Sequence, residues 1–281
     1  MQKYYKKYFA PFLLPLMICF IFAFVVPFLM GIYFSFTKFI TIKNAAFTGF
    51  ENYQIAFGPG TTFWSSFGRT VAFVVVSVLT INIFAFLLAL LLTRGLKLTN
   101  FFRSVFFMPN LIGGIVLGYI WNLLINGILN AFGTNIYANP AFGFWGLVVL
   151  MNWQQVGYMM VIYIAALMNV PQDLTESAQV DGAGKFAIVK NITIPMIAPS
   201  ITICTFLTLT NGFKLYDQNL ALTGYSVPEN QLLALNIFNT MFNENNGNMG
   251  PGQAKAVIFF IVVASISFLQ LYTSRKREVE V

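Results

Sequence analysis

One stretch of the chain looks at first like a phosphate-binding loop. Residues 182–186 read Gly-Ala-Gly-Lys-Phe, which is similar to the end of the glycine-rich loop that cradles nucleotide phosphates. That loop needs a glycine five residues before its Gly-Lys pair, where this chain has Gln179. It also needs a serine or threonine after the lysine to hold Mg²⁺, where this chain has Phe186. We therefore expect no nucleotide site and no other cofactor in this chain.

Other reactive side chains are scarce. The sequence has no histidine, which removes the usual zinc ligand and the usual proton carrier at neutral pH. Cys19 and Cys204 lie in apolar runs, without a third cysteine or a Cys-x-x-Cys motif, so we expect two reduced core residues. No convincing pair of a nucleophile and a base is present. We predict no catalytic site and no metal site, and hence a protein that is not itself an enzyme.

Amide and aromatic side chains are the remaining candidates for chemistry. They occur inside long apolar stretches, where polar groups are costly and usually face a cavity or another helix. Amides can bond hydroxyl groups while rings stack on the apolar face of a sugar, so the group as a whole suits a sugar. For any one residue the alternative is a hydrogen bond between helices, or a ring at the membrane interface. The cluster includes Trp121, Asn122 and Asn126, and the predicted substrate-binding residues are Asn110, Asn152, Trp153, Gln154, Gln155, Tyr158 and Asn211.

The elements that carry these residues must lie in lipid. Hydrophobic residues make up 58% of the 281 and charged residues only 9%, whereas about a quarter of a soluble domain is charged. About 20 apolar residues cross a hydrocarbon core of roughly 30 Å as a helix. We predict an all-α membrane protein, with residues 1–281 forming one transmembrane domain of six helices. The predicted spans are about 10–36, 68–92, 104–126, 144–168, 197–217 and 254–273.

The distribution of basic residues predicts the orientation in the membrane. An even number of spans places both termini on one side, and if that side is the cytoplasm the basic residues favour the inside by eleven to five. The inside set is Lys3, Lys6, Lys7, Arg94, Lys97, Arg103, Lys185, Lys190, Arg275, Lys276 and Arg277, and the outside set is Lys38, Lys43, Arg69, Lys214 and Lys255. The net charge of +7 then reflects topology and contact with anionic membrane lipid, not nucleic-acid binding. We expect a multi-pass protein of the plasma membrane with both termini in the cytoplasm.

The connection at about 169–194 is the one long loop on the predicted cytoplasmic side. Pro171 suits the first turn of a short helix, where its missing N–H costs nothing. Gly182 is suited to end that helix in a left-handed conformation, and a second short helix is expected over about 183–192. Pro195 suits the first turn of the fifth span. A folded loop on a protein without a soluble domain is best explained as a docking surface.

The residues of this loop resemble the EAA loop of ATP-binding-cassette importer permeases. Residues 176–183 read Glu-Ser-Ala-Gln-Val-Asp-Gly-Ala, and Ile192, Pro195 and Pro199 follow. In that family Glu-Ala-Ala is followed after two residues by Asp-Gly-Ala, and then by Ile and Pro at fixed distances. The resemblance extends from about Phe12 to Tyr272 and looks strongest to the sugar-permease branch that includes the maltose-type importers.

The resemblance implies a function and a set of partners. The chain would translocate a sugar or oligosaccharide together with a second homologous permease and an extracytoplasmic sugar-binding protein. Two copies of a cytoplasmic ATPase would hold the ATP and Mg²⁺ and dock on the coupling loop at 172–192. The implied coupling residues are Glu176, Ala178, Asp181, Gly182, Ala183 and Pro195. Three departures from the family pattern, Ser177, Phe186 and Val189, would affect the choice of partner rather than docking itself.

Two other kinds of transporter remain as alternatives. One is an importer permease for another small solute such as glycerol phosphate. The other, which has less support, is a secondary transporter, because a proton-coupled transporter normally carries carboxylates or histidines at mid-membrane. Spans one to four and six have none, and Asp217 lies near an interface. Asp217 is three residues from Lys214, so the two would form an ion pair on one helix face or a solvated pair.

Overall fold

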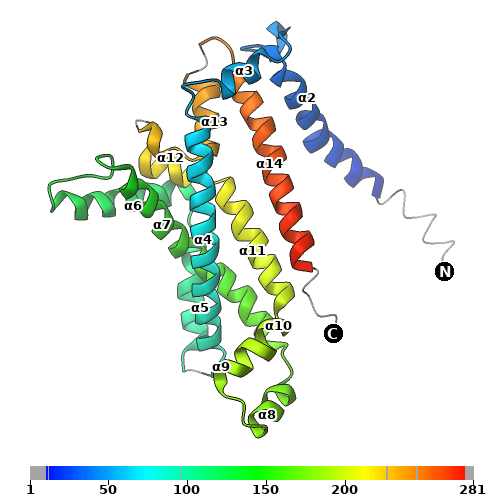
Figure 1. The fold of residues 1–281 in the computed structure, drawn as a ribbon, viewed down its shortest axis with the longest axis vertical. Helices are drawn as coiled ribbons and strands as arrows, with labels where there is room; N and C mark the ends of the chain where they lie inside the picture. Colours follow the sequence, from blue (N-terminus) through cyan, green and yellow to red (C-terminus); the bar gives the residue numbers. More distant parts are fainter. Residues whose placement is uncertain (1–10, 12, 96, 226, 245, 276–281) are drawn as a thin grey trace. The chain divides into compact units, whose positions relative to one another are not determined.

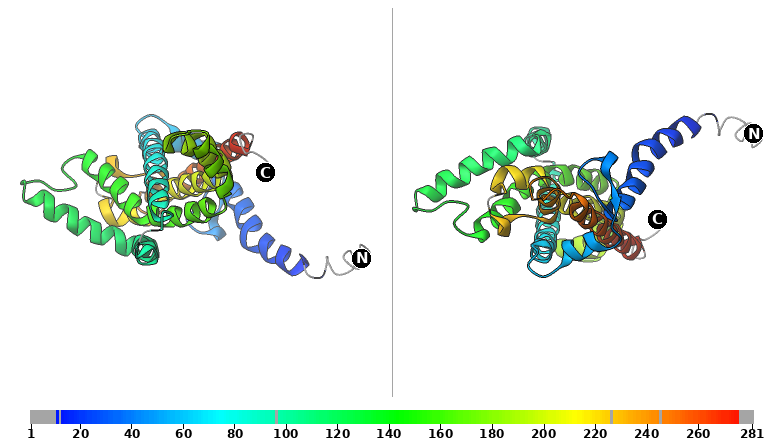
Figure 2. Two further views of the ribbon diagram at one scale, coloured as in Figure 1. Left: turned by 90° about the horizontal axis from the view of Figure 1, so that it is seen from below. Right: turned by 90° about the horizontal axis from the view of Figure 1, so that it is seen from above.

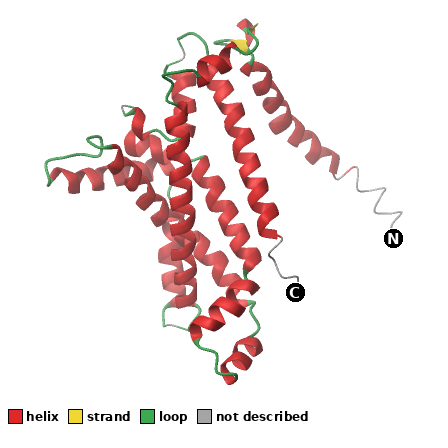
Figure 3. Cartoon of the chain, viewed as in Figure 1, coloured by secondary structure: helices red, strands yellow, loops and turns green. Residues whose placement is uncertain are grey.

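The chain is built almost entirely from helices. The computed structural model describes residues 11, 13–95, 97–225, 227–244 and 246–275 (Figures 1 and 3). The expectation of an all-α protein is wrong for one short antiparallel pair, β1 (Thr37–Lys38) with β2 (Ala46–Phe47). The helices are η1 (Ile21–Val25), α2 (Val26–Ser35), η2 (Ile42–Asn44), α3 (Glu51–Phe57), α4 (Phe63–Leu92), α5 (Thr99–Phe107), η3 (Met108–Leu111), α6 (Gly114–Asn130), α7 (Pro140–Met168), α8 (Gln172–Val180), α9 (Lys185–Ile188), η4 (Val189–Thr193), α10 (Ile194–Met196), α11 (Ala198–Phe213), α12 (Asp217–Thr223), η5 (Pro228–Asn230), α13 (Leu233–Phe242) and α14 (Gly250–Arg275).

The described residues contain between four and six candidate membrane spans. Four single helices are long and apolar enough to cross a membrane: Leu13–Ser35, Phe63–Leu92, Pro140–Met168 and Gly250–Ser274. The other two candidates are bent pairs, Thr99–Leu111 with Gly114–Asn130 at 100°, and Lys185–Met196 with Ala198–Phe213 at 73°. The first bend falls inside the span expected over 104–126, and the second lies at the start of the span expected over 197–217. The predicted cytoplasmic termini, with Lys3, Lys6, Lys7, Lys276 and Arg277, lie outside the described residues.

Proline and glycine account for both breaks. The first lies at η3, which contains Pro109, and continues through Ile112 and Gly113, whose backbones are extended. The second lies at Ile197, and Pro199 follows as the second residue of α11. A proline ring removes one backbone donor and clashes with the carbonyl group four residues before it, so a continuous helix cannot pass.

The chain divides into two compact units. Unit 1 comprises Met1–Phe63 and Ile237–Ile261, and unit 2 comprises Trp64–Asn236 and Val262–Val281. In unit 1 the side chain of Asn52 is fully buried, and its amide donates to the carbonyls of Ser35 and Thr37 at 2.9 and 2.8 Å. It also accepts a bond from the amide of Asn248 at 3.0 Å. One side chain thus ties α3 to the chain around β1 and to the segment that leads into α14.

Polar side chains join the long helices of unit 2. Asn82 in α4 donates to the hydroxyl of Thr208 in α11 at 3.0 Å and accepts from the hydroxyl of Tyr163 in α7 at 2.7 Å. The amide of Asn152 in α7 donates to Thr80 Oγ1 in α4 at 2.9 Å. Such bonds between helices satisfy polar groups that would otherwise be unpaired in an apolar interior. They hold α4, α7 and α11 together as the frame of the unit.

Candidate functional site

Four of the amides predicted to bind substrate line one cavity of about 280 Å³ in unit 2. Asn110 comes from η3, Gln154 and Gln155 from α7, and Asn211 from the last turn of α11. The remaining lining residues, which we did not single out as substrate contacts, are Lys214, Leu215, Tyr216, Asp217 and Gln218. We refer to this space as the amide cavity.

The side chain of Gln154 has partners at both ends of its amide. Gln154 is 7% exposed, and its Nε2 donates to the carbonyl of Ile112 at 3.3 Å. Its Oε1 accepts a bond from Nε2 of Gln218 at 2.9 Å. Gln154 is therefore a structural link between α7, the break of the third span and the first turn of α12.

The neighbouring Gln155 is buried to the same degree but is not satisfied. Its Nε2 donates to the sulfur of Met151 at 3.5 Å, and a thioether is a weak acceptor. Its Oε1 is buried without a hydrogen-bond partner among the described residues. Leaving a buried acceptor unpaired is costly, so a bound molecule with a hydroxyl donor would satisfy this oxygen.

The segment between α11 and α12 closes one side of the cavity. Lys214 and Asp217 are both exposed, and they contribute one positive and one negative charge to the lining. Of the two accounts of this pair, an ion pair on one helix face does not hold, because α11 ends at Phe213 and α12 begins at Asp217. Burial raises the pKa of Tyr216, and a hydrogen bond to the hydroxyl of Tyr225 adds to this effect, so its phenol stays neutral. The cavity lining as a whole carries no net charge.

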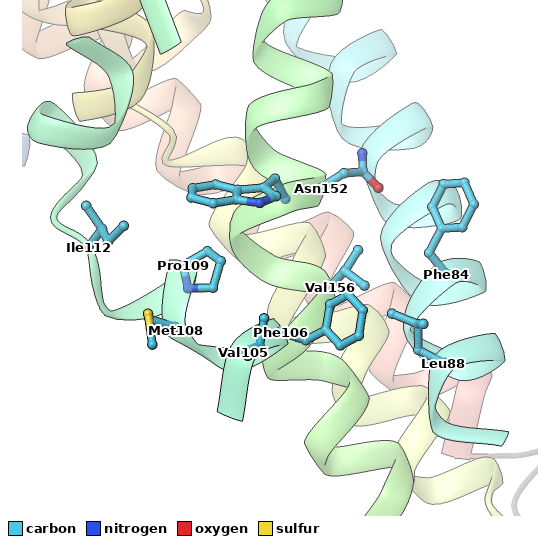
Figure 4. Close-up of a pocket in the computed structure, with 11 residues that line it drawn as sticks. Phe84, Leu88, Val105, Phe106, Met108, Pro109, Ile112, Asn152 and Val156 are labelled. Atoms are coloured by element: carbon cyan, nitrogen blue, oxygen red, sulfur yellow. The ribbon is translucent and has the colours of Figure 1, made fainter. Parts of the chain in front are cut away.

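Asn152 and Trp153 face a different space, an apolar pocket of about 560 Å³ (Figure 4). Successive residues of an α-helix are turned by about 100°, so residues 152–155 are spread around α7 and do not all lie on one side of it. The rest of this apolar pocket is formed by Phe84, Leu88, Val105, Phe106, Met108, Pro109, Ile112, Val156 and Gly157. The structure does not bring Asn152 and Trp153 to the amide cavity.

The other polar residues of this cluster serve mainly as links between elements. Tyr158 lines neither cavity, and its ring centre lies 6.3 Å from that of Phe107. Asn122 donates to the carbonyl of Leu222 at 2.6 Å, and Asn126 accepts from the backbone N–H of Ile136 at 2.9 Å. These two asparagines therefore form hydrogen bonds within the fold, which was the alternative to binding a sugar.

The loop at 172–192 ends its first helix in the conformation that the sequence predicts. Gly182 has a φ of 84°, which is left-handed. Its N–H bonds to the carbonyl of Gln179 at 3.0 Å, and the N–H of Ala183 bonds to the carbonyl of Ala178 at 2.9 Å. These two bonds form a Schellman motif, which satisfies carbonyl groups that a helix end leaves free. The Ala-x-x-Asp-Gly-Ala run is therefore a rigid helix stop.

The second part of the loop is longer than expected. α9 begins at Lys185 and continues as η4 and α10 to Met196, and Pro195 lies in α10, before the break that leads into α11. Pro171 precedes α8 as its N-cap instead of lying in its first turn.

The loop presents two apolar side chains that are unusually exposed. Val180 is 87% exposed and Phe186 is 79% exposed, and they lie on either side of the Gly182 turn. Glu176 and Asp181 are exposed as well. The connection from α4 to α5 lies at the same end of unit 2 (Figure 1). Five residues of the predicted inside set therefore gather near this end: Arg94, Lys97, Arg103, Lys185 and Lys190.

The residues that sequence reasoning missed follow a helix break. Gln218 lies beyond the expected fifth span and Tyr216 lies at its very end, so neither was considered as part of a cavity. The signal available was the charged pair Lys214 and Asp217 at the end of an apolar run, since charges there mark the end of a span or the wall of a cavity.

Comparisons with known proteins agree on one family. Residues 81–279 match the family described as the binding-protein-dependent transport system inner membrane component. The chain is 41% identical over 264 residues to the probable starch degradation products transport system permease protein AmyD of Thermoanaerobacterium thermosulfurigenes, covering 90% of this chain and 89% of that one. It is 29% identical to the trehalose/maltose transport system permease protein MalF of Thermococcus litoralis, covering 84% and 82%. Its fold is similar to a chain of a bacterial ABC transporter that imports the acidic polysaccharide alginate, with a TM-score of 0.82, 20% identity and 98% of both chains covered.

Proposed function

This chain belongs to the inner membrane components of binding-protein-dependent transport systems, and we propose that it carries a sugar or oligosaccharide through the membrane as the permease subunit of an importer. The observation that carries the choice of cargo is the convergence of Asn110, Gln154, Gln155 and Asn211 on one cavity. Relatives named for starch degradation products and for trehalose and maltose support the same choice. Among the lining residues, Gln155 is the one with a buried and unpaired acceptor for a hydroxyl group.

We propose that a separate cytoplasmic ATPase drives transport and docks on the loop at 172–192. The chain lacks a complete phosphate-binding motif, so the nucleotide must be held elsewhere. The exposed side chains of Val180 and Phe186 offer an apolar contact on a rigid helix stop. ATP binding would close two ATPase copies, and the loop would pass that movement to α11 through α10.

Further partners are proposed on the same basis. A second homologous permease would complete the pathway, and an extracytoplasmic binding protein would deliver the sugar. The candidate span Leu13–Ser35 supports contact with another chain or with lipid, since none of its most apolar window is buried within this chain. Docking of a binding protein agrees with a relative in fold that was solved with an alginate pentasaccharide-bound periplasmic protein.

The orientation follows from the basic residues that gather at the loop end of unit 2. We propose that this end faces the cytoplasm together with both termini. A cysteine introduced at Thr99 should be shielded from an impermeant thiol reagent in intact cells, and one at Asn139 should be labelled. The reverse pattern would overturn the orientation.

The two alternatives fit the cavity less well. A permease for glycerol phosphate would need an excess of positive charge, but the lining holds one lysine and one aspartate. A proton-coupled transporter would need a titrating group in a span, and no Asp, Glu or His lies in the candidate spanning helices of the described residues.

Transport in a reconstituted system tests the proposal. The permease and its partner subunits would be placed in vesicles with the binding protein and supplied with radiolabelled maltotriose. We expect maltotriose to accumulate only when ATP is present on the side of the membrane where the ATPase binds. A proton uncoupler should not change this accumulation. Accumulation of glycerol 3-phosphate in place of maltotriose, or uptake driven by a proton gradient alone, would contradict it.

A further inference from the structure

Two interruptions of helical structure, one at Ile112 and one between α11 and α12, meet at the side chain of Gln154. Ile112 has an extended backbone between η3 and α6, so its carbonyl belongs to neither helix. This carbonyl accepts the 3.3 Å bond from Gln154 Nε2. Gln218 lies in the first turn of α12, directly after the break that follows α11, and donates to Gln154 Oε1 at 2.9 Å. A single buried amide thus connects α7 to both breaks.

The two helices beyond the breaks are packed closely against each other. α6 and α12 run side by side (Figure 2). A Cβ added at Gly114 would lie 2.9 Å from Cδ of Gln218, and one added at Gly118 would lie 2.9 Å from the carbonyl oxygen of Gln218. There is no room for a side chain at either glycine, so α6 and α12 are in close contact, and we expect them to move as a pair. The bond from Gln218 to Gln154 therefore fastens both helices to α7.

We propose that Gln154 and Gln218 form a clamp that sets the width of the amide cavity and thereby the affinity for the cargo, an inference that rests on the proposed sugar-permease function. Both are positioning residues, because each end of the Gln154 amide already has a partner, Ile112 at the nitrogen and Gln218 at the oxygen. Gln155, the next residue on α7, keeps its acceptor for the cargo. When the clamp is broken, α6 and α12 lose their hydrogen-bonded link to α7 beside the cavity. The wall formed by Tyr216 and Asp217 then no longer holds the sugar against Gln155.

A double-mutant cycle on the reconstituted importer tests the clamp. The variants are Gln154→Met, Gln218→Met and the two together, since methionine preserves the length of the side chain. The measured quantity is the KM for uptake of maltotriose. We expect each single change to raise KM about fivefold, the size of one lost hydrogen bond. The double variant should show no larger rise than Gln154→Met alone, because that change already removes the bond to Gln218. Effects of the two single changes that multiply would overturn the proposal.

Two further variants separate a clamp from general stabilisation. Gln155→Met should raise KM independently, so its effect should multiply with that of Gln218→Met. Gln270→Met is the matched control, because Gln270 in α14 also bridges two helices of unit 2, through the carbonyl of Thr202 in α11 at 3.4 Å. It should lower the melting temperature and leave KM unchanged. A clamp variant that behaves like Gln270→Met, with lower stability and unchanged KM, would show that the pair has no positioning role.

Cross-linking gives a readout that does not depend on the cargo. In a background with Cys19→Ala and Cys204→Ala, cysteines replacing Gln154 and Gln218 should be joined by a short bifunctional methanethiosulfonate reagent in membranes that hold the assembled importer. Cysteines replacing Trp153 and Gln218 should not, because Trp153 lines the apolar pocket on another side of α7. Equal yields for the two pairs, or none for 154 with 218, would overturn the clamp. If the selective cross-link forms but the wild-type importer ignores maltotriose, the proposed cargo fails and the clamp stands.

Discussion

The loop at 172–192 and the amide cavity belong to the same proposed transport cycle, but they are built in opposite ways. The loop owes its shape to bonds between backbone groups of one contiguous run, from Ala178 to Ala183. The cavity owes its shape to side chains from several elements, joined by the bonds from Gln154 to Ile112 and Gln218. A backbone turn depends on the φ of one residue, whereas a cavity wall can lose one bond at a time. We therefore expect abrupt effects in the loop and graded effects in the cavity.

The largest effect is expected at Gly182. Its φ of 84° is strained for any residue with a side chain, and most of all for a β-branched one. Gly182→Val should cost roughly 1–3 kcal/mol in the turn. The spans should still insert, since the change lies outside them, while sugar-stimulated ATP hydrolysis falls by about tenfold or more. Both quantities can be followed on the purified importer.

Gly184 provides the matched control for that change. Its φ is −70° and its ψ is 159°, a region open to every residue, and a Cβ there would meet nothing within 4 Å. Gly184→Ala should leave coupling close to the wild-type level. Normal transport in the Gly182→Val protein would mean that the loop only connects two helices.

A smaller effect is expected on the exposed surface of the same loop. Val180→Asp should change the stability of the permease by less than about 0.5 kcal/mol, because the side chain is 87% exposed. A carboxylate would be desolvated in an apolar contact, so co-purification of the ATPase should weaken several-fold. Gln172→Asp is the control, since it places a carboxylate at the other end of α8, where the helix dipole favours it. Equal loss in both variants would point to charge alone and remove Val180 from the docking surface.

In the cavity we expect a graded response. Asn211→Ala should raise the KM for maltotriose about threefold, since one hydrogen bond contributes about 0.5–1.5 kcal/mol. Hydrolysis of ATP without sugar should not change. Asn126→Ala is the comparison, because the side chain of Asn126 accepts a bond from the backbone of Ile136 and does not line the cavity. That variant should melt earlier with an unchanged KM, and a complete loss of uptake in Asn211→Ala would contradict the graded response.

The contrast between these regions explains what the sequence could predict. The Gly182 turn was predictable because a helix stop depends on local residues, and its left-handed glycine is confirmed. The meeting of Asn110 with Gln154, Gln155 and Asn211 was predictable because buried amides in spans must find partners. Their binding of sugar stays a prediction. The clamp partner Gln218 was not predictable, since it depends on where a broken helix resumes in space.

One wrong prediction, the grouping of residues 152–155, was avoidable. Residues 152–155 were predicted as one substrate-binding group, but four successive residues of an α-helix are spread over about 300° around its axis, so they cannot all face one cavity. The breaks at Ile112 and Ile197 also had local signals in Pro109 and Pro199. Their angles of 100° and 73° follow from packing against other elements, and no local pattern contains that information.

The smallest effect is expected on the far side of α7, at Trp153. This ring is 46% exposed, lies 5.8 Å from the ring of Trp121 and lines the apolar pocket. If the cargo binds only in the amide cavity, Trp153→Leu should change the KM for maltotriose by less than about twofold. Trp145→Leu is the matched control, since Trp145 is another exposed ring of α7. A ring that stacks on the sugar would lose its contact area in this variant, so a rise of fivefold or more in Trp153→Leu alone would move the sugar to the apolar pocket. The polar and apolar faces of α7 would then exchange their proposed roles.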